Sequence, residues 1–427
     1  MSAITSYIRL QESQQNRLDW LVQTAYTAWR LFVKNELTNH AAATAFYFLL
    51  SAAPLVLLLT YGAQYLARLA ETSVLASMLL AALYDQFQLA QLAALGVIPQ
   101  KAAIAAGGVG LLTLLLSSRG LVNALQSAFR VIFPDDAKRH FVFNWTLPLI
   151  IIPVAFALVG LTVTAQAVIN FLANVELLGA GRSTLFKSLN LLLGIGLVWG
   201  LLYLVLRRMP LRHPPVFPTL IISGLATLTL GLLYLGFGHF YRVEKYQAVY
   251  GALGGVVFIL IGAYLACMAF YFWAQFLYAL TKVDVAALEK LFLGAGEGAN
   301  KLDSIVFGRA NRLLTKYGHT FAEGETLIRE GDASRDAFFL YSGKVGLFKD
   351  IGGQEKRLGV LAEGELFGEM AYLLNEHRTA TVRAEGDVTA LVLPPEMLEE
   401  LMRYSAPLAR RIIDSLAGRL MRMNQVM

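Results

Sequence analysis

The residues best suited to chemistry form one short run near the C-terminus, residues 367–382, which reads Phe-Gly-Glu-Met-Ala-Tyr-Leu-Leu-Asn-Glu-His-Arg-Thr-Ala-Thr-Val. A short helix after Gly368 would point unpaired backbone N–H groups at an anion. Arg378 would add a charge-assisted, two-pronged hydrogen bond to the same anion, and Thr379 could donate one more. Glu369 can accept a hydrogen bond from a hydroxyl group. These residue types in this order fit an anionic ligand that also offers a hydrogen-bond donor.

This run resembles the phosphate-binding cassette of cyclic nucleotide-binding domains, which share Phe-Gly-Glu, a short helix, and an arginine followed by a small residue and Ala-Thr/Ser-Val. The resemblance covers about residues 305–424 and implies cAMP or cGMP as a regulatory ligand, with no cofactor. It places Glu369 on the ribose 2′-hydroxyl and Arg378 on the phosphate. His377 departs from the proline of many members, which affects loop rigidity but removes no contact. The implied ligand-binding residues are Phe367, Gly368, Glu369, Met370, Ala371, Arg378, Thr379 and Ala380.

The last helix of such a domain would cover the base of the nucleotide. The candidate lid residues are Arg410, Arg411, Ile412, Ile413, Leu416 and Arg419. Thr379 is compatible with either cAMP or cGMP, so the choice between them stays open. The alternative to a nucleotide site is a β roll that keeps the shape of the domain and has lost the ligand.

The surrounding sequence predicts a β roll with flanking helices. Gly324 and Gly331 are expected at tight corners, because glycine adopts positive φ angles without steric cost. Residues 337–343 are predicted to form a strand that ends in a glycine turn, and residues 344–348 the return strand. Short helices are expected before the strands, at 282–292 and 302–317, and a helical region follows at 395–424.

The rest of the chain has the composition of a membrane protein. Hydrophobic residues make up 56% of the 427 residues and charged residues only 15%, where soluble domains carry about a quarter. A spanning helix needs about 20 mostly apolar residues. Six spans are predicted, at roughly 41–66, 102–118, 143–174, 188–206, 216–240 and 250–281. Residues 73–98 are apolar but hold several polar side chains, and we interpret them as a helix at the outer surface or packed on the bundle.

Lys and Arg residues are more numerous in the segments that would face the cytoplasm if the N-terminus is inside. Six spans then place both termini in the cytoplasm, where a cyclic nucleotide would be met. The predicted fold is a multi-domain chain, with an all-α six-helix transmembrane bundle followed by a cytoplasmic, jelly-roll-like β roll with flanking helices. The predicted parts are a cytoplasmic amphipathic segment 1–36, a six-span domain 37–285, a linker 286–304 and a cyclic nucleotide-binding domain 305–427.

The membrane region resembles the BrkB/YihY family of six-span bacterial proteins. The resemblance is carried by Ala-Ala-Ala-Thr-Ala-Phe-Tyr-Phe-Leu-Leu-Ser-Ala-Ala-Pro at 41–54, Ser-Arg-Gly-Leu-Val-Asn-Ala-Leu-Gln at 118–126, the stretch 202–210, and Tyr-Gly-Ala-Leu-Gly at 250–254. It implies a multi-pass protein of the bacterial inner membrane, for which transport is the usual expectation.

Other chemistries have little support in the sequence. Cys267 is the single cysteine, so the chain cannot form an internal disulfide or a cysteine metal site. No catalytic or metal-ligand spacing is present, which argues against an enzyme. The chain stops soon after the last predicted helix, so no DNA-binding helix-turn-helix is expected and nucleic acid is not a predicted partner. Glycines four apart, such as Gly196 and Gly200, fit close helix packing and leave a homo-oligomer open.

Two functions fit these features. The first is a cyclic-nucleotide-regulated transporter or channel for an unknown solute. The second is a membrane-anchored sensor that recruits a protein partner and moves no solute.

Overall fold

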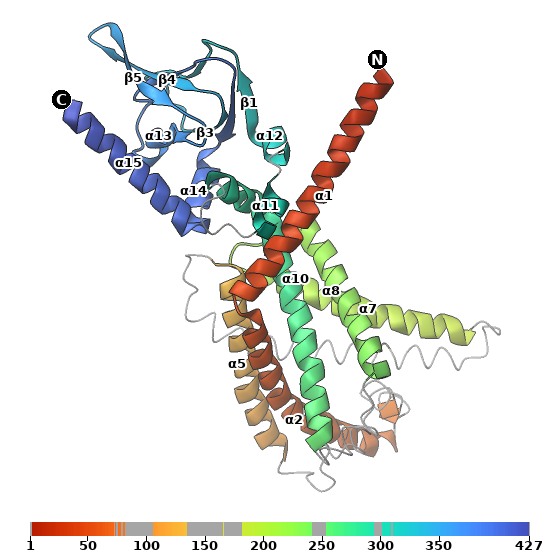
Figure 1. Cartoon of the computed structure of the whole chain (residues 1–427). Helices are drawn as coiled ribbons and strands as arrows, with labels where there is room; N and C mark the ends of the chain where they lie inside the picture. The colour runs from red at the N-terminus through yellow and green to blue at the C-terminus, as the bar shows by residue number, and fades with distance from the viewer. Residues whose placement is uncertain are drawn as a thin grey trace. The chain divides into compact units, whose positions relative to one another are not determined.

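The computed structural model describes residues 2–71, 73, 76–77, 80–81, 106–134, 165, 182–240, 253–293, 301–308 and 311–426 (Figure 1). The chain divides into two compact units. The helical unit contains residues 28–278, and the β-roll unit contains residues 1–27 together with 279–427. The chain passes from one unit to the other within two helices, α1 (Ser2–Lys34) and α10 (Leu253–Leu293).

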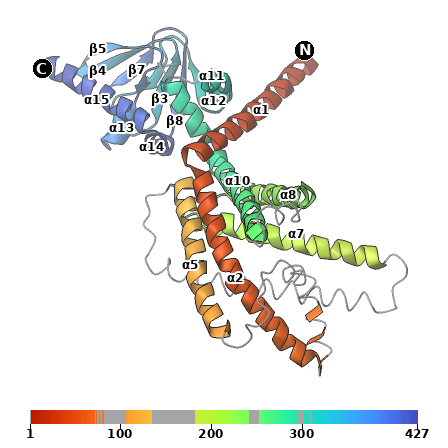
Figure 2. The same cartoon turned by 60° about the horizontal axis from the view of Figure 1, so that its bottom comes forward.

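The helical unit is built from long apolar helices. They are α2 (Leu37–Ala70), α5 (Ala106–Ile132), α7 (Arg182–Arg208), α8 (Val216–Phe240) and the first part of α10. Helices α2 and α5 lie side by side (Figures 1 and 2), and α7 contacts α8. In the part of the chain that the structure describes, three helical segments are long and apolar enough to cross a membrane. They are Leu191–Arg208, Val216–Phe237 and Val256–Leu293.

Where the structure describes the predicted spans, they are helical. Helix α8 has the predicted bounds, and α2 and α7 enclose theirs. Helix α5 runs on to Ile132, beyond the predicted end at 118, because Val122, Phe129 and Ile132 give its second half a buried apolar face. All of the predicted span 143–174 except residue 165, and most of 73–98, lie outside the described residues. The number of spans therefore stays a prediction.

Polar side chains link the helices of this unit. The Thr44 and Tyr271 hydroxyls are 2.6 Å apart, which joins α2 to α10. Trp273 Nε1 donates to Thr229 Oγ1 at 2.9 Å, which joins α10 to α8. Such bonds between apolar helices fix their register, since each partner would otherwise be an unsatisfied polar group.

The β-roll unit contains two four-stranded antiparallel sheets, ordered β1-β8-β3-β6 and β2-β7-β4-β5. The strands are β1 (Gly318–Phe321), β2 (Thr326–Ile328), β3 (Ala337–Ser342), β4 (Val345–Ile351), β5 (Gln354–Leu361), β6 (Leu366–Phe367), β7 (Thr381–Ala384) and β8 (Val388–Leu393). The expected corners are confirmed, because Gly324 and Gly331 have φ angles of 80° and 84°. Gly343, at 95°, turns β3 into β4 as predicted.

Helices precede and follow the strands in the sequence, and one short helix, α13, lies between β6 and β7. They are α11 (Lys301–Phe307), α12 (Asn311–Tyr317), α13 (Glu369–Leu373), α14 (Pro395–Tyr404) and α15 (Ala406–Val426). The predicted glycine-rich stretch of the linker, 294–298, lies outside the described residues. The predicted helix 282–292 is not separate, because α10 continues through it to Leu293. No glycine or proline interrupts residues 263–293, so nothing in the sequence stops the helix.

The end of α10 belongs to the hydrophobic core of the β-roll unit. Val285, Leu288 and Phe292 are at most 5% exposed and share one cluster with residues of β3, β8, α14 and α15. The ring centroids of Phe292 and Phe339, which lies on β3, are 4.3 Å apart. The last two turns of α10 are therefore held by the same core that holds the strands.

A polar network ties the same part of α10 to its neighbours. Asp284 accepts hydrogen bonds from Arg312 and Lys316 of α12. Asp303 of α11 accepts from Lys290 Nζ and from Tyr26 Oη of α1, both at 2.6 Å. These bonds fix α10 against α1, α11 and α12 within the β-roll unit.

Candidate functional site

The site begins at Gly368, between β6 and α13. Its φ of 75° lies in the left-handed region, which glycine adopts freely. A Cβ at this position would lie 2.8 Å from Arg378 Nη1, 3.0 Å from Ile328 Cδ1 and 3.2 Å from the Asp336 carbonyl oxygen. Only glycine lets the chain turn into α13 this close to the arginine.

Arg378 lies at the centre of the site and is 4% exposed. Its Nη1 donates to the Gly368 carbonyl and its Nη2 to the Asp336 carbonyl, both at 2.7 Å. Its Nε donates to Ser334 Oγ at 3.0 Å. These bonds use three of the five N–H groups of a guanidinium and hold its plane in one orientation. The remaining N–H groups can serve an anionic ligand.

The site carries a buried positive charge with acidic groups around it. Burial lowers the pKa of the Arg378 guanidinium below its usual value, and the charges of Asp336, Asp332 and Glu369 act in the opposite direction. The guanidinium keeps its proton in proteins, so burial leaves a desolvated positive charge at this point. Arg378 also lies 5.9 Å from the centroid of the Phe338 ring. A phosphate at this point would give the buried cation a direct counter-charge.

The other predicted site residues lie in β6, in α13 and directly after Arg378. Glu369 is the first residue of α13 and is 1% exposed, and Ala371 in the same helix is 3% exposed. Phe367 is 1% exposed, and its ring stacks on Phe338 at 5.4 Å between centroids. Met370 and Ala380 are half-buried, whereas Thr379 is exposed.

Two backbone hydrogen bonds fix the arginine loop to the strand connection before it. Gly331 N donates to the Arg378 carbonyl at 2.9 Å, and Arg378 N donates to the Asp332 carbonyl at 3.0 Å. The glycine corner at 331, which the sequence analysis assigned only to the shape of the roll, thus also positions the arginine.

Ser334 and Asp336 were not among the predicted site residues. They precede Arg378 by 44 and 42 residues and reach it only through the folded sheet. The hydrogen bond from Arg378 goes to the backbone carbonyl of Asp336, for which residue type gives no signal. The hydroxyl of Ser334, shortly before β3, was the one feature of residue type that could have indicated a hydrogen-bond partner.

The candidate lid residues lie on α15. Arg411 Nη1 donates to the Phe292 carbonyl at 2.6 Å, at the end of α10. Ile412 is 5% exposed and lies in the core, whereas Ile413 is 62% exposed and Arg410 is exposed as well. Arg419 also falls within α15. Their role over a base stays a prediction.

No group of three or more His, Cys, Asp or Glu side chains that could hold a metal occurs among the described residues. The arrangement around Arg378 combines a buried, oriented guanidinium with the buried carboxylate of Glu369.

Comparison with known proteins agrees with both parts of this architecture. Residues 319–405 match the family described as Cyclic nucleotide-binding domain. Residues 28–291 match the family described as Virulence factor BrkB, which is more than half of the chain. The latter match includes the end of α10 that lies in the β-roll core.

Individual relatives resemble the β-roll unit. A Cyclic AMP receptor protein of Thermus thermophilus is 37% identical over 101 residues, which is 23% of this chain and 47% of that protein. A cGMP-dependent protein kinase of Toxoplasma gondii is 37% identical over 82 residues, or 19% of this chain and 8% of the kinase. The chain thus spans less than half the length of these relatives.

Among solved structures, the crystal structure of the Thermus thermophilus Catabolite Activator Protein is similar to this chain at 28% identity, with a TM-score of 0.26. The similarity covers 32% of this chain and 61% of that one.

Proposed function

We propose that this chain, which belongs to the Virulence factor BrkB family, is an integral membrane protein whose membrane region is regulated by cAMP or cGMP. Its cyclic nucleotide-binding domain would bind the nucleotide. The chain is a membrane protein with a nucleotide-sensing domain. The finer proposal is a nucleotide-regulated transporter or channel of the bacterial inner membrane, with both termini in the cytoplasm.

One observation carries the sensing part of this proposal. Arg378 is buried, oriented by three hydrogen bonds and placed beside the buried carboxylate of Glu369. A degenerate roll would have no reason to keep a desolvated cation at this point, because burial of a charge costs several kcal/mol and the nearby carboxylates offset only part of it. A cyclic phosphate offers that compensation, and the adjacent ribose hydroxyl suits the carboxylate.

The regulatory part is supported by a short path inside the β-roll unit. A phosphate bound by the remaining N–H groups of Arg378 would share the guanidinium with the carbonyl of Asp336, the residue directly before β3. Phe339, three residues further along that strand, contacts Phe292 at the end of α10. Nucleotide binding regulates the membrane region only if it favours one arrangement of this path over another.

Calorimetric titration of cAMP and cGMP into the full-length chain in detergent tests the sensing step. We expect binding by the unmodified protein and a loss of roughly 10-fold to 150-fold in affinity in Arg378→Ala, because hydrogen bonds to charged groups contribute about 1.5–3 kcal/mol. The matched control is Arg383→Ala. That arginine is half-buried and pairs with the exposed Glu355, so its removal should change the affinity by less than about twofold.

Absence of binding to the unmodified protein, or equal affinity of Arg378→Ala, would contradict the sensing proposal. Hydrogen exchange of α10 amides with and without saturating nucleotide then tests regulation. Altered exchange near Phe292 supports coupling to the membrane region. Unchanged exchange would favour a membrane-anchored sensor that acts through a protein partner.

A further inference from the structure

The first helix, α1, exposes large apolar side chains and buries polar ones. Its exposed apolar side chains are 48–62% exposed, and they are Leu18, Leu21, Val22, Trp29 and Val33. Among the described side chains of α1, the buried ones are Gln23, Thr24, Thr27, Ala28 and Phe32. A surface helix of a soluble protein turns its apolar face to the core and its polar face to water. The outward face of α1 is therefore suited to an apolar environment.

The exposed apolar side chains form one continuous stripe along the helix. Leu18, Val22, Trp29 and Val33 stand at i, i+4, i+11 and i+15, and the exposed Ala25 stands at i+7. Residues with this spacing share one face of an α-helix. Leu21 lies at the edge of the same face. We call these six residues the α1 stripe, which is about 22 Å long and contains no charged residue.

Hydrogen bonds within the β-roll unit fix which face of α1 points outward. Gln23 Nε2 donates to the Val306 carbonyl, and Gln23 Oε1 accepts from Arg312 Nε, both at 3.2 Å. Tyr26 Oη donates to Asp303 as described above. A rotation of α1 that buried the stripe would leave the buried amide of Gln23 without these partners, which is costly. The exposure of the stripe is therefore a consequence of how α1 is bound.

Basic side chains lie along both edges of the stripe. At about 100° per residue, Arg30 and Lys34 follow one edge and Arg17 follows the other, and all three are exposed. The one acidic residue in 15–34, Asp19, is half-buried. Basic residues beside an apolar face are typical of helices that lie on anionic lipid. Trp29, within the stripe, is a residue type enriched at the membrane–water interface.

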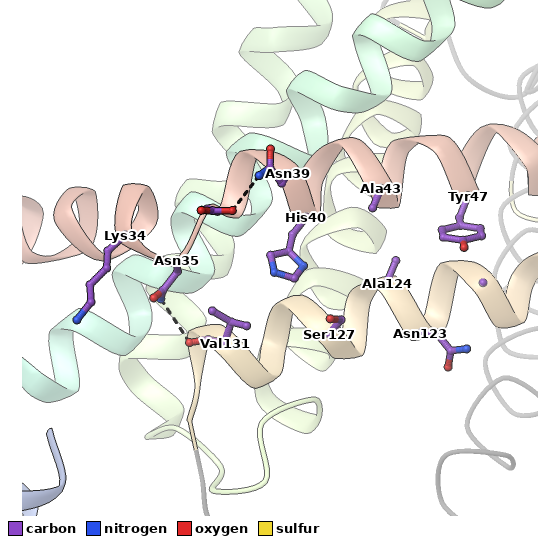
Figure 3. A pocket seen from close by; sticks show the side chains of 12 residues that line it. Lys34, Asn35, Asn39, His40, Ala43, Tyr47, Asn123, Ala124, Ser127 and Val131 are labelled. Atoms are coloured by element: carbon purple, nitrogen blue, oxygen red, sulfur yellow. Dashed lines mark hydrogen bonds between the residues drawn. The ribbon is translucent and has the colours of Figure 1, made fainter. Parts of the chain in front are cut away.

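The stripe ends close to the first predicted membrane span. Only residues 35 and 36 separate α1 from α2, the helix that encloses the predicted span 41–66. Figure 3 shows Asn35 in this turn, with its side-chain amide directed at the Val131 carbonyl on α5. Because two residues span at most about 7 Å, the stripe ends next to the start of the membrane helix.

We propose that the α1 stripe lies in the interface of the bilayer, with the axis of α1 along the membrane surface. Its apolar side chains reach the boundary between headgroups and acyl chains, about 5–10 Å deep for helices of this kind. Arg17, Arg30 and Lys34 bind the phosphate groups of anionic lipids. This lipid contact requires the membrane region but does not depend on nucleotide binding.

Fluorescent probes on single cysteines of the full-length chain in lipid nanodiscs test the proposal. Cys267→Ser removes the one native cysteine. Val22→Cys and Val33→Cys place the probe in the stripe. Glu323→Cys, at an exposed residue between β1 and β2, is the matched control. Quenching is measured with iodide in the water, and with phospholipids that carry a spin label either near the headgroup or near the chain end. The discs contain phosphatidylcholine with phosphatidylglycerol.

We expect the headgroup-proximal label to quench the probes at 22 and 33 strongly, the deep label to quench them less, and iodide to quench them little. The probe at 323 should respond to iodide alone. Trp29→Asp changes an exposed side chain, so the fold should persist. It should nevertheless reduce lipid quenching at both stripe positions, because a carboxylate loses hydration in the interface. Discs of phosphatidylcholine alone should reduce it as well.

Iodide quenching at 22 and 33 as strong as at 323 would place the stripe in water and overturn the proposal. Protection from iodide without quenching by either lipid label would also overturn it, because protein, such as a second copy of this chain, would then cover the stripe. Stronger quenching by the deep label would contradict a helix in the interface. Equal quenching with and without phosphatidylglycerol would contradict the contact with anionic lipid. Arg378→Ala should leave every value unchanged, which separates this surface from the nucleotide site.

Discussion

Substitution of Gly368 by alanine tests whether the orientation of Arg378 is what binds the nucleotide. Two costs arise. The first is local, because a residue with a side chain in the left-handed region loses about 1–2 kcal/mol. The second is the collision of the new Cβ with Arg378 Nη1, which would be 2.8 Å away. The guanidinium must then give up its bond to the residue 368 carbonyl, a charged hydrogen bond that contributes about 1.5–3 kcal/mol.

Gly364 offers a matched control for the first cost alone. Its φ is 84°, and a Cβ there would have no atom within 4 Å. Gly364→Ala should therefore lose about 1–2 kcal/mol of stability and leave Arg378 in place. Gly368→Ala should lose about 2.5–5 kcal/mol, the sum of both costs.

The decisive comparison is affinity rather than stability. If the displaced guanidinium no longer meets the phosphate, calorimetric titration should show affinity reduced by roughly 10-fold to 150-fold in Gly368→Ala. Gly364→Ala should remain within about twofold of the unmodified protein. Thermal unfolding of both variants in detergent gives the stability difference. Equal affinities in the two variants would refute the view that the orientation of Arg378 decides binding.

Two further substitutions test the attachment of α10 to the β-roll core. Phe292→Ala should destabilise the β-roll unit by about 3–5 kcal/mol, because it removes a buried aromatic ring. The assay is denaturant unfolding, followed through loss of nucleotide binding. The control is Leu302→Ala, which changes a 54% exposed side chain and should cost less than about 0.5 kcal/mol. Asp284→Asn removes the charge that pairs with Arg312 and should cost about 1–3 kcal/mol in the same assay, whereas Glu399→Gln breaks an exposed pair within one helix and should cost less than about 0.5 kcal/mol. Equal losses within either pair would show that these contacts do not hold α10.

The candidate site could be proposed from the sequence because its key groups lie close together along the chain. Gly368, Glu369 and Arg378 fall within one run, and their local order determines their chemistry. The partners that orient the arginine could not be predicted in the same way. Ser334 and the Asp336 carbonyl meet it across the roll, and a backbone carbonyl has no signature in residue type.

Helix ends were predicted less well than helix cores. The prediction ended a span at 118 because Ser118 and Arg119 are polar, although the residues beyond them keep a helical apolar face that is buried in the structure. It ended another at 281 because Lys282 and Asp284 bring charge. Charge marks where a membrane span can end, but a helix ends only where its hydrogen bonding or packing ends.

The continuation of α10 changes how the two parts of the chain can influence each other. A flexible connection would let the β roll bind its ligand with little effect on the last span. Here Val285, Leu288 and Phe292 are buried in the core of the roll, and Asp284 and Lys290 pair with α12 and α11. A close-packed core transmits displacement. If β3 shifts at Phe339, either Phe292 moves with it or a cavity opens between the two rings. The same helix then continues without a glycine or proline back to residue 263, so its end cannot move independently of that stretch unless the helix bends.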